Sequence, residues 1–319
     1  MLDLLLSYSR TLIDSCYGPT KPSDDDVEAN ILIEEILQIY DQMLVCKKSD
    51  SFAEINDLFS GIRLICTKPI NERVTDLILY DPRIVGIVQD LRSFCSDIEF
   101  RIETQWGLKA VASENSTEKE VCERILEFPY MNVYANLIRA ELSGMRSVEK
   151  NPIKRIAFIG SGPLPISSLC LTGMIFDAPT NIRVLNIDRD EEALELSKTL
   201  CSRLGKKAGN IEFQLAEAGS NLELYDYDAV YLAALVGDTQ QQKEMLLEQV
   251  TSKMRPGALL VMRSGSKIKS LIYSNLDPTS EAVSRLIDIA LILHPHKYNI
   301  VNSVYIGRVK GINNQLVPT

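Results

Sequence analysis

Residues 156–165 read Ile-Ala-Phe-Ile-Gly-Ser-Gly-Pro-Leu-Pro, and this stretch decides the fold. An apolar run rich in isoleucine ends there in a turn that contains Gly160 and Gly162, which predicts a strand feeding a helix across a ligand-binding turn. Gly160 permits the sharp turn, and Gly162 lets the backbone approach a ligand without an intervening Cβ. The helix that follows offers free backbone NH groups to a carboxylate or phosphate, and a proline in its first turn costs little.

The surroundings of this turn are typical of a doubly wound α/β fold. A second strand is expected over residues 182–187 and leads into Asp188, whose carboxylate is placed to accept hydrogen bonds from a ribose. The alternative for Asp188 is a solvated N-cap of the helix near Glu191, but its place at the end of a strand favours ribose binding. The third glycine of the usual dinucleotide fingerprint is absent, so the turn alone does not identify the ligand.

Helix and strand signals divide the chain near residue 148. Residues 1–148 carry helical stripes, clearest over 24–45 and 82–106, and are expected to form a helical bundle domain. In residues 149–319, short β-branched runs alternate with amphipathic helices, which predicts a mostly parallel sheet covered on both faces, with helices between its strands. We expect strands at 154–159, 182–187, 211–215, 228–233 and 258–262, and a closing antiparallel pair at 289–293 and 301–306. That closing pair resembles the end of the Rossmann-like sheet of S-adenosylmethionine-dependent methyltransferases.

The composition narrows the partners of the protein. The chain has 319 residues, of which 45% are hydrophobic, so it is long and apolar enough to form two domain cores. The net charge of −9 argues against a nucleic-acid groove or an anionic membrane surface, because both need clustered Lys and Arg. No run approaches the roughly 18 apolar residues of a membrane span, and no export leader is expected. A small-molecule substrate is the natural partner; the oligomeric state stays open, with a homodimer as one alternative.

The cysteines and histidines predict neither a disulfide framework nor a metal site. The seven cysteines, Cys16 among them, are widely spread and include no Cys-x-x-Cys pair, which indicates reduced thiols in a cytoplasmic protein. His294 and His296 are the only histidines and are interpreted as loop residues. Motifs of serine hydrolases, P-loop proteins and zinc proteases are absent from the sequence. We therefore expect no metal requirement.

Several polar features are expected at the carboxyl ends of the strands, where ligands of open α/β sheets bind. Arg263, after the fifth strand, is able to pair bidentately with a substrate carboxylate, but a surface salt bridge is an equal alternative. The expected ligand-binding residues are Gly160, Ser161, Gly162, Pro163, Leu164, Asp188, Glu217, Ala233, Ala234 and Leu235.

Glu99 and Glu103 lie four residues apart on the long helix expected over 82–106. They stack on one helix face, roughly 40° apart, and two carboxylates there repel unless something uses them. Because Glu99 borders the apolar stripe, at least one carboxylate is expected to face an interior or a cleft, where a raised pKa would suit it to accept a proton from an amine. The alternative, which spacing alone favours, is that both are solvated or paired with Arg92 or Arg101.

Residues 128–134, Phe-Pro-Tyr-Met-Asn-Val-Tyr, supply an aromatic cluster near the boundary between the two halves. Tyr130 and Tyr134 lie one helical turn apart, and a phenol there would orient a substrate by hydrogen bonding. The alternative is packing between the domains, the more common use of a buried tyrosine. We expect Tyr130, Asn132 and Arg263 to contact the substrate.

Several blocks together resemble nicotianamine synthases, in a form similar to those of filamentous fungi. The resemblance runs in order along the chain from Phe128 to Val304, and no block of it lies before Asp81. Its blocks are Phe128-Pro129-Tyr130 with Asn132 and Tyr134, residues 157–165, residues 230–237 (Val-Tyr-Leu-Ala-Ala-Leu-Val-Gly), Arg263-Ser264, and His294-Pro295 followed by Val301-Asn302-Ser303-Val304. At Met131 the sequence departs from the plant pattern, which often has a second tyrosine there.

The resemblance implies a helical domain over a methyltransferase-like domain, with a buried reaction chamber between them. It also implies that three S-adenosylmethionine molecules give one nicotianamine and three methylthioadenosines, by attack of an α-amino group on the aminocarboxypropyl carbon. By the match of Ile102-Glu103 with Trp106, Glu103 resembles the family glutamate that deprotonates the amine, with Glu99 as the alternative. Tyr134 resembles the tyrosine that orients the substrate.

Two other functions share these features. One is a true S-adenosylmethionine-dependent methyltransferase acting on a small molecule, which would have the same fold and the same glycine turn. The other is a binding module for an adenosine ligand or a metal chelate that has no catalytic activity. Transfer of the methyl group to an acceptor would identify the first, and binding of intact S-adenosylmethionine would identify the second.

Overall fold

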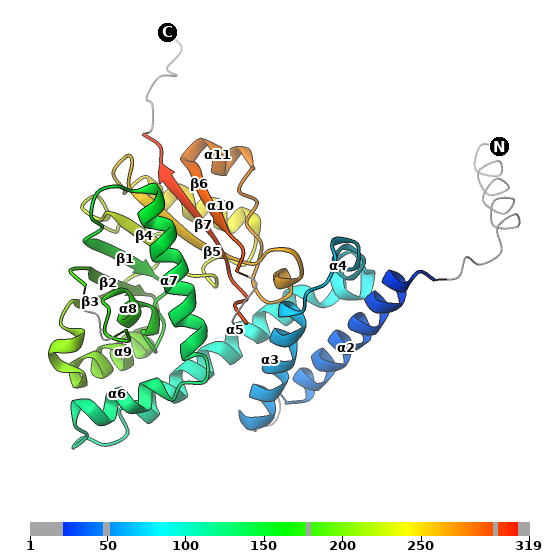
Figure 1. Ribbon diagram of the computed structural model, residues 1–319, viewed down its shortest axis with the longest axis horizontal. Helices are drawn as coiled ribbons and strands as arrows, with labels where there is room; N and C mark the ends of the chain where they lie inside the picture. Colours follow the sequence, from blue (N-terminus) through cyan, green and yellow to red (C-terminus); the bar gives the residue numbers. More distant parts are fainter. Residues whose placement is uncertain (1–21, 47–51, 177–179, 296–298, 312–319) are drawn as a thin grey trace, which may run out of the picture.

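The computed structural model describes residues 22–46, 52–176, 180–295 and 299–311, so the expectations for Cys16 and His296 lie outside the described residues. A set of helices lies beside an α/β sheet, and the long helix α5 (Pro82–Ala110) joins the two regions (Figure 1). The helices before the sheet are α2 (Asp24–Cys46), α3 (Phe52–Thr67), α4 (Glu72–Leu79), α5, α6 (Glu118–Leu126) and α7 (Met131–Val148). This order confirms the helical first half.

The long helix α5 begins as its sequence predicts. Asp81 is its N-cap and accepts a hydrogen bond from the backbone NH of Arg83 at 2.8 Å, while Pro82 occupies the first turn. Leu91, Cys95, Ile98 and Ile102 form its buried stripe. The helix extends four residues beyond the expected end and packs against α2 and α3 as well as against α9 (Glu191–Arg203).

The sheet has seven strands in the order β3-β2-β1-β4-β5-β7-β6. Strands β1 to β5 pair in parallel, and β7 pairs antiparallel with both β5 and β6. All of the expected strands are confirmed to within a few residues. Their bounds are β1 (Arg155–Ile159), β2 (Arg183–Asp188), β3 (Ile211–Leu215), β4 (Ala229–Leu232), β5 (Leu259–Ser264), β6 (Ile287–Leu293) and β7 (Ser303–Val309).

The expectation of a helix between all consecutive parallel strands is wrong at one place. Residues 216–228, between β3 and β4, form turns and bends with no helix. The cluster Gly219-Ser220-Asn221 explains this, because all three residue types favour turns over helix interiors. The other helices of this region are α8 (Ile166–Leu171), α9, α10 (Gln240–Thr251) and α11 (Glu281–Leu286), with the 3₁₀ helices η1 (Gly205–Ala208) and η2 (Lys267–Leu271).

The two faces of the sheet belong to two cores. On one face, Phe158 and Tyr231 stack with ring centroids 5.1 Å apart, and the buried residues around them continue into the helices α2 to α7. On the other face, Ala157 and Val230 pack with Leu247 of α10. The alternation follows the period of two along a strand. Because one buried cluster crosses from the helices to the sheet, the division at residues 148 and 149 stays a prediction.

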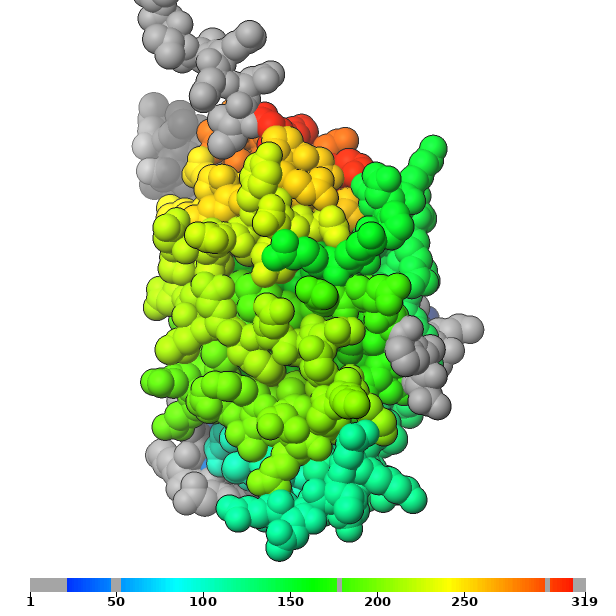
Figure 2. Space-filling model, turned by 90° about the vertical axis from the view of Figure 1, so that its left-hand side faces the viewer, coloured from blue at the N-terminus to red at the C-terminus, as the bar shows by residue number. Residues whose placement is uncertain are grey.

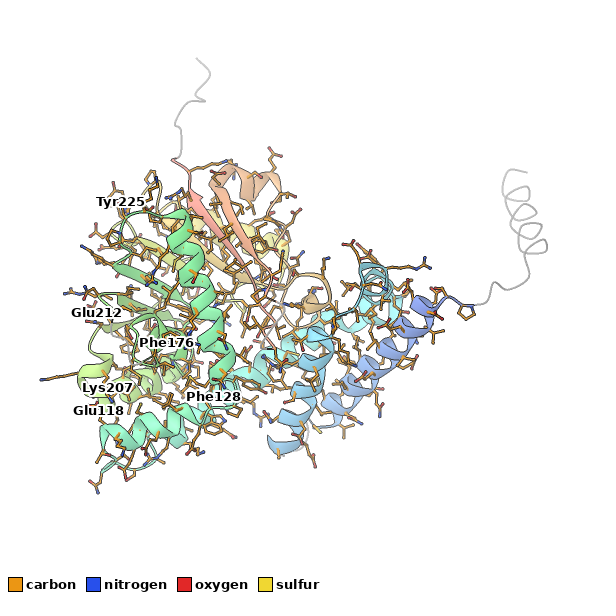
Figure 3. The ribbon with its side chains drawn as sticks, in the orientation of Figure 1. Glu118, Phe128, Phe176, Lys207, Glu212 and Tyr225 are labelled. Atoms are coloured by element: carbon orange, nitrogen blue, oxygen red, sulfur yellow. The ribbon has the colours of Figure 1, made fainter. Side chains whose placement is uncertain are left out.

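Helix α6 contacts the side of the sheet region through α9 and η1. In Figure 2, the blue-green residues of α6 lie directly below the yellow-green residues that follow β2. Figure 3 labels Glu118 and Lys207 at this contact, where their charged groups are 3.2 Å apart, and Phe128 near the junction of α6 and α7. Helix α6, which follows α5 and precedes α7, thus packs against the helix after β2.

None of the six described cysteines forms a disulfide, in line with the expectation of reduced thiols. Burial raises the pKa of Cys66, Cys170 and Cys201 to about 12, so these thiols are inert at neutral pH. Within the described ranges, no cluster of three or more His, Cys, Asp or Glu side chains is arranged to hold a metal ion. Nor does any described helix combine the length and the apolar character that crossing a membrane requires.

Candidate active site

A cavity of about 850 Å³ lies at the carboxyl ends of the parallel strands. It is lined by residues that follow β1, β2, β3 and β4, by Arg263 of β5, by α5 and by Tyr134 of α7. The order of the strands reverses between β1 and β4, which is where open α/β sheets bind their ligands. Of the expected ligand-binding residues, Pro163 does not line the cavity, whereas Gly160, Ser161, Gly162, Leu164, Asp188, Glu217, Ala233, Ala234 and Leu235 do.

The turn after β1 requires both of its glycines. Gly160 has φ +80° and Gly162 has φ +67°, values that other residues rarely adopt. A Cβ on Gly160 would lie 2.8 Å from Cγ2 of Val236, and a Cβ on Gly162 would lie 2.9 Å from Oε2 of Glu103. The second approach brings the end of the Glu103 side chain directly against the turn.

Asp188, the last residue of β2, anchors this turn. Its Oδ2 accepts a hydrogen bond from the backbone NH of Gly162 at 2.7 Å, and its Oδ1 accepts one from the NH of Asp190 at 3.0 Å. The N-cap of α9 is Asp190, which accepts from the NH of Ala193, so the alternative role of Asp188 as a helix cap is wrong. Its carboxylate lines the cavity, and a ribose contact stays a prediction.

Glu99 and Glu103 both line the cavity from α5 and are joined by tyrosines. The hydroxyl of Tyr134 donates to Oε1 of Glu103 at 2.6 Å and lies 3.4 Å from Oε1 of Glu99. The hydroxyl of Tyr273 lies 3.0 Å from both oxygens of Glu99. The expectation that at least one carboxylate faces a cleft is therefore confirmed for both.

The alternative pairing of these glutamates with Arg92 or Arg101 is wrong. Nε of Arg92 donates to the carbonyl of Ser270 at 2.7 Å, and neither arginine forms an ion pair with Glu99 or Glu103. Arg101 is exposed on the other side of the helix.

Burial shapes the protonation of the pair. Burial and, second to it, the nearby charge of Glu99 raise the pKa of Glu103 to about 8. Burial also raises the pKa of Glu99, but the charge of Arg63 and the hydrogen bond from Tyr273 oppose the change. Glu103 therefore keeps its proton to a higher pH than an ordinary glutamate does, and it becomes a proton acceptor once that proton is lost.

The surface salt bridge considered for Arg263 is wrong, because its side chain is 6% exposed and its partner Glu141 is fully buried. Nε and Nη2 donate to the two oxygens of Glu141 at 2.8 and 3.0 Å, and Nη1 donates to Oγ of Ser167 at 3.0 Å. This bidentate pair joins β5 to α7. Arg263 still lines the cavity, so a substrate carboxylate would share a guanidinium that is already neutralised.

Tyr130 and Asn132, expected to contact the substrate, do not line the cavity. The hydroxyl of Tyr130 is 3.3 Å from Oγ of Ser60, and its ring packs against Phe128 with centroids 5.7 Å apart, so the packing alternative describes it. Asn132 is exposed. The helical period explains this, because Asn132 and Tyr134 point roughly 200° apart around α7.

Two buried residues of the site carry no signal in the sequence. Tyr273 follows η2, outside any motif, and becomes a neighbour of Glu99 only through the fold. Lys243 of α10 donates to the carbonyls of Ala234 and Val236, both at 3.2 Å, and so holds the cavity loop after β4. Burial lowers the pKa of Lys243 to about 8. Lysine is usually a solvated residue, and nothing in the sequence around Lys243 indicates its burial.

Gly162→Ala is expected to reduce both ligand binding and turnover. The new Cβ would displace the carboxylate of Glu103, and its backbone would stay at a φ that costs about 1–2 kcal/mol outside glycine. The control is Gly257→Ala, because Gly257 has φ +82° but open space around its Cβ position. Calorimetric titration of both variants with S-adenosylmethionine checks this; equal affinities would show that the contact with Glu103 has no effect on binding.

The strand order, the glycine turn after β1 and the acidic end of β2 define the fold of S-adenosylmethionine-dependent methyltransferases. The family model described as nicotianamine synthase protein matches residues 24–314. The chain belongs to the nicotianamine synthase family.

Curated relatives and solved structures agree with this family. The chain is 27% identical to nicotianamine synthase 2 of Arabidopsis thaliana over 90% of this chain and 86% of the relative. It is 32% identical to nicotianamine synthase 9 of Hordeum vulgare over 80% and 72%. The crystal structure of a variant of MtNAS in complex with S-adenosylmethionine has a TM-score of 0.72 at 16% identity, covering 88% of this chain and 99% of that chain. At that identity the likeness concerns the fold.

Proposed function

We propose that this protein is a nicotianamine synthase. It condenses three molecules of S-adenosylmethionine by aminocarboxypropyl transfer and releases three molecules of methylthioadenosine. Membership of the family over residues 24–314 supports the activity. S-adenosylmethionine is a substrate here and not a resident cofactor, and no step of the reaction calls for a metal.

One observation carries this proposal: the carboxylate of Glu103 lies against Gly162 of the turn after β1 and accepts a hydrogen bond from Tyr134 at 2.6 Å. A proton acceptor therefore lies next to Gly162, where the absence of a Cβ lets a ligand approach the backbone. An amine attacks only in its unprotonated form, so the proposed reaction needs a base beside the bound S-adenosylmethionine. We assign the role of base to Glu103 and the role of orienting hydroxyl to Tyr134.

Each transfer forms one nitrogen–carbon bond and breaks one carbon–sulfur bond. The lone pair of the α-amino nitrogen forms a bond to the aminocarboxypropyl carbon next to sulfur, and the carbon–sulfur bond breaks toward sulfur, which leaves as methylthioadenosine. The proton of the amine passes to the ionised carboxylate of Glu103. Because the pKa of Glu103 is raised to about 8, that carboxylate is a stronger base than an ordinary glutamate.

The cavity is large enough to hold S-adenosylmethionine. Its volume of about 850 Å³ is near the upper end of the roughly 300–1,000 Å³ that single-ligand pockets occupy. MtNAS, whose fold resembles that of this chain, has been crystallised with MTA and tNA, and a variant of it with S-adenosylmethionine. Membership of the nicotianamine synthase family supports the same choice of ligands here. We assign Asp188 to the ribose. We place the enzyme in the cytoplasm, where free thiols like those of the six described cysteines are expected. A homodimer stays a prediction.

Incubation of the purified protein with S-adenosylmethionine as the sole small molecule tests the proposal. Mass spectrometry should find methylthioadenosine and nicotianamine in a ratio of three to one, because nucleophile and electrophile come from the same substrate. Accumulation of S-adenosylhomocysteine would reject the proposal in favour of a methyltransferase. Recovery of intact S-adenosylmethionine that nevertheless binds would indicate a module without catalysis.

A further inference from the structure

Tyr273 reaches the two glutamates from a separate part of the chain. It follows η2, is 3% exposed and lines the cavity. Its hydroxyl lies 3.0 Å from each oxygen of Glu99 and has one proton to donate, which it shares between them. A phenol held in this way stabilises the ionised form of the carboxylate more than the protonated form.

Arg63 of α3 favours the same ionised form. Its side chain is buried, and it forms no ion pair with any carboxylate among the residues that the structure describes. Its Nη2 donates to the carbonyl of Asn299 at 3.2 Å, and its guanidinium lies 4.7 Å from the ring centroid of Tyr130. The charge of Arg63 is the largest influence that lowers the pKa of Glu99.

Glu103 has a different environment. Its hydrogen-bond donor is Tyr134. Burial and the charges of Glu99 and Asp188 raise its pKa, whereas the hydrogen bond from Tyr134 and the charge of Arg263 lower it. The two carboxylates stand one helical turn apart on α5 and share Tyr134. Two such groups do not ionise independently, because the charge of the first opposes the charge of the second.

We propose that Tyr273 is a positioning residue of the reaction. Its hydroxyl keeps Glu99 in the ionised form, so that Glu103 is the carboxyl that gains and loses the proton. This deepens the proposed function and rests on it. Glu99 remains charged throughout each turnover, and the amine proton goes to Glu103 alone. The groups that face the pair are Arg63, Cys95, Tyr134, Asp188, Arg263 and Tyr273.

Tyr273→Phe tests this role, because it removes the hydroxyl and keeps the ring. Without the hydrogen bond from Tyr273, Glu99 competes with Glu103 for the proton that the pair shares. Glu103 is ionised in the molecules where Glu99 holds that proton, so ionised Glu103 appears at a lower pH. The acid limb of the pH profile of kcat/KM should move down by about one pH unit, so that the rate at pH 6.5 rises up to about tenfold relative to the alkaline plateau. Glu99→Gln should move the limb in the same direction, because it removes the charge itself.

Tyr231→Phe is the matched control. Tyr231 is buried like Tyr273, but the hydrogen-bond partner of its hydroxyl among the described residues is the sulfur of Met145, at 3.9 Å. Its profile should superimpose on that of the wild type. A uniform loss of rate in Tyr273→Phe, with the limb unmoved, would overturn the proposal and leave Tyr273 a packing residue.

A second readout separates this proposal from the proposed function. Infrared titration of the protonated carboxyl band that disappears in Glu103→Gln reports the ionisation of Glu103 without any turnover. The band should titrate near pH 8 in the wild type and lower in Tyr273→Phe. An unchanged midpoint would overturn the role of Tyr273 even in an active enzyme, whereas a shifted midpoint in a protein that forms no methylthioadenosine would reject the proposed activity alone.

Discussion

Glu103→Gln is expected to keep S-adenosylmethionine binding and to lose turnover by roughly 10²-fold to 10⁴-fold, the usual cost of removing a general base. The amide preserves the shape of the side chain and its hydrogen bond with Tyr134, 2.6 Å long in the parent protein. It cannot accept the proton of the attacking amine. Binding measured by calorimetry and turnover measured as methylthioadenosine release should therefore separate.

The activities of the wild type and of Glu103→Gln should depend on pH in different ways. In the wild type, activity should rise with pH through about 8, as Glu103 loses its proton. In Glu103→Gln, the defect should ease as the pH approaches the pKa of the amine itself, because solvent then takes over deprotonation. A defect that is constant across the pH range would argue against the role of base.

Glu99→Gln is the internal control for the assignment, since it alters the neighbouring carboxylate on the same helix face. It should retain turnover. If Glu99→Gln is inactive while Glu103→Gln turns over normally, the base is Glu99 and the assignment is one helical turn out of register. If both variants remain active, the base lies elsewhere.

Glu141→Leu is expected to have the largest effect on stability. It would leave the guanidinium of Arg263 buried without its carboxylate, and breaking a buried pair from one side costs about 3–5 kcal/mol in the free energy of unfolding. The fall should appear as a lower midpoint of urea unfolding. Because the pair joins β5 to α7, the position of Tyr134, seven residues before Glu141 on the same helix face, should be disturbed as well.

Two comparisons separate the buried charge from the loss of contacts. The double variant Glu141→Leu/Arg263→Met should recover most of the lost stability, because no unpaired charge remains. Asp226→Asn breaks the exposed pair with Arg155 and should cost less than about 1 kcal/mol. Equal losses for Glu141→Leu and Asp226→Asn would contradict the account of the buried pair.

The strands and the glycine turn could be predicted from the sequence because local patterns determine them. Short runs rich in apolar residues mark β1 to β5. The positive φ of Gly160 and Gly162 could be predicted because glycine is the residue type that adopts it readily. The stacking of Glu99 and Glu103 on one face of α5 is also a local property. These features placed the site at the correct end of the sheet.

The partners across the site could not be predicted, because they are far apart in the chain. Arg263 and Glu141 are separated by 122 positions, and Tyr273 and Glu99 by 174. No periodicity encodes such a pairing. The outward direction of Asn132 and the packing of Tyr130 depend on where α7 begins, which a motif match does not specify.

The most direct test of the central claim follows the methyl group. The protein should be given S-adenosylmethionine with a fully deuterated methyl group, and the products should be separated and weighed by mass spectrometry. The account predicts that the label is found entirely in methylthioadenosine and that the amino-acid product carries none, because the aminocarboxypropyl carbon is the one attacked. Deuterated methyl on any acceptor, with release of S-adenosylhomocysteine, would contradict it.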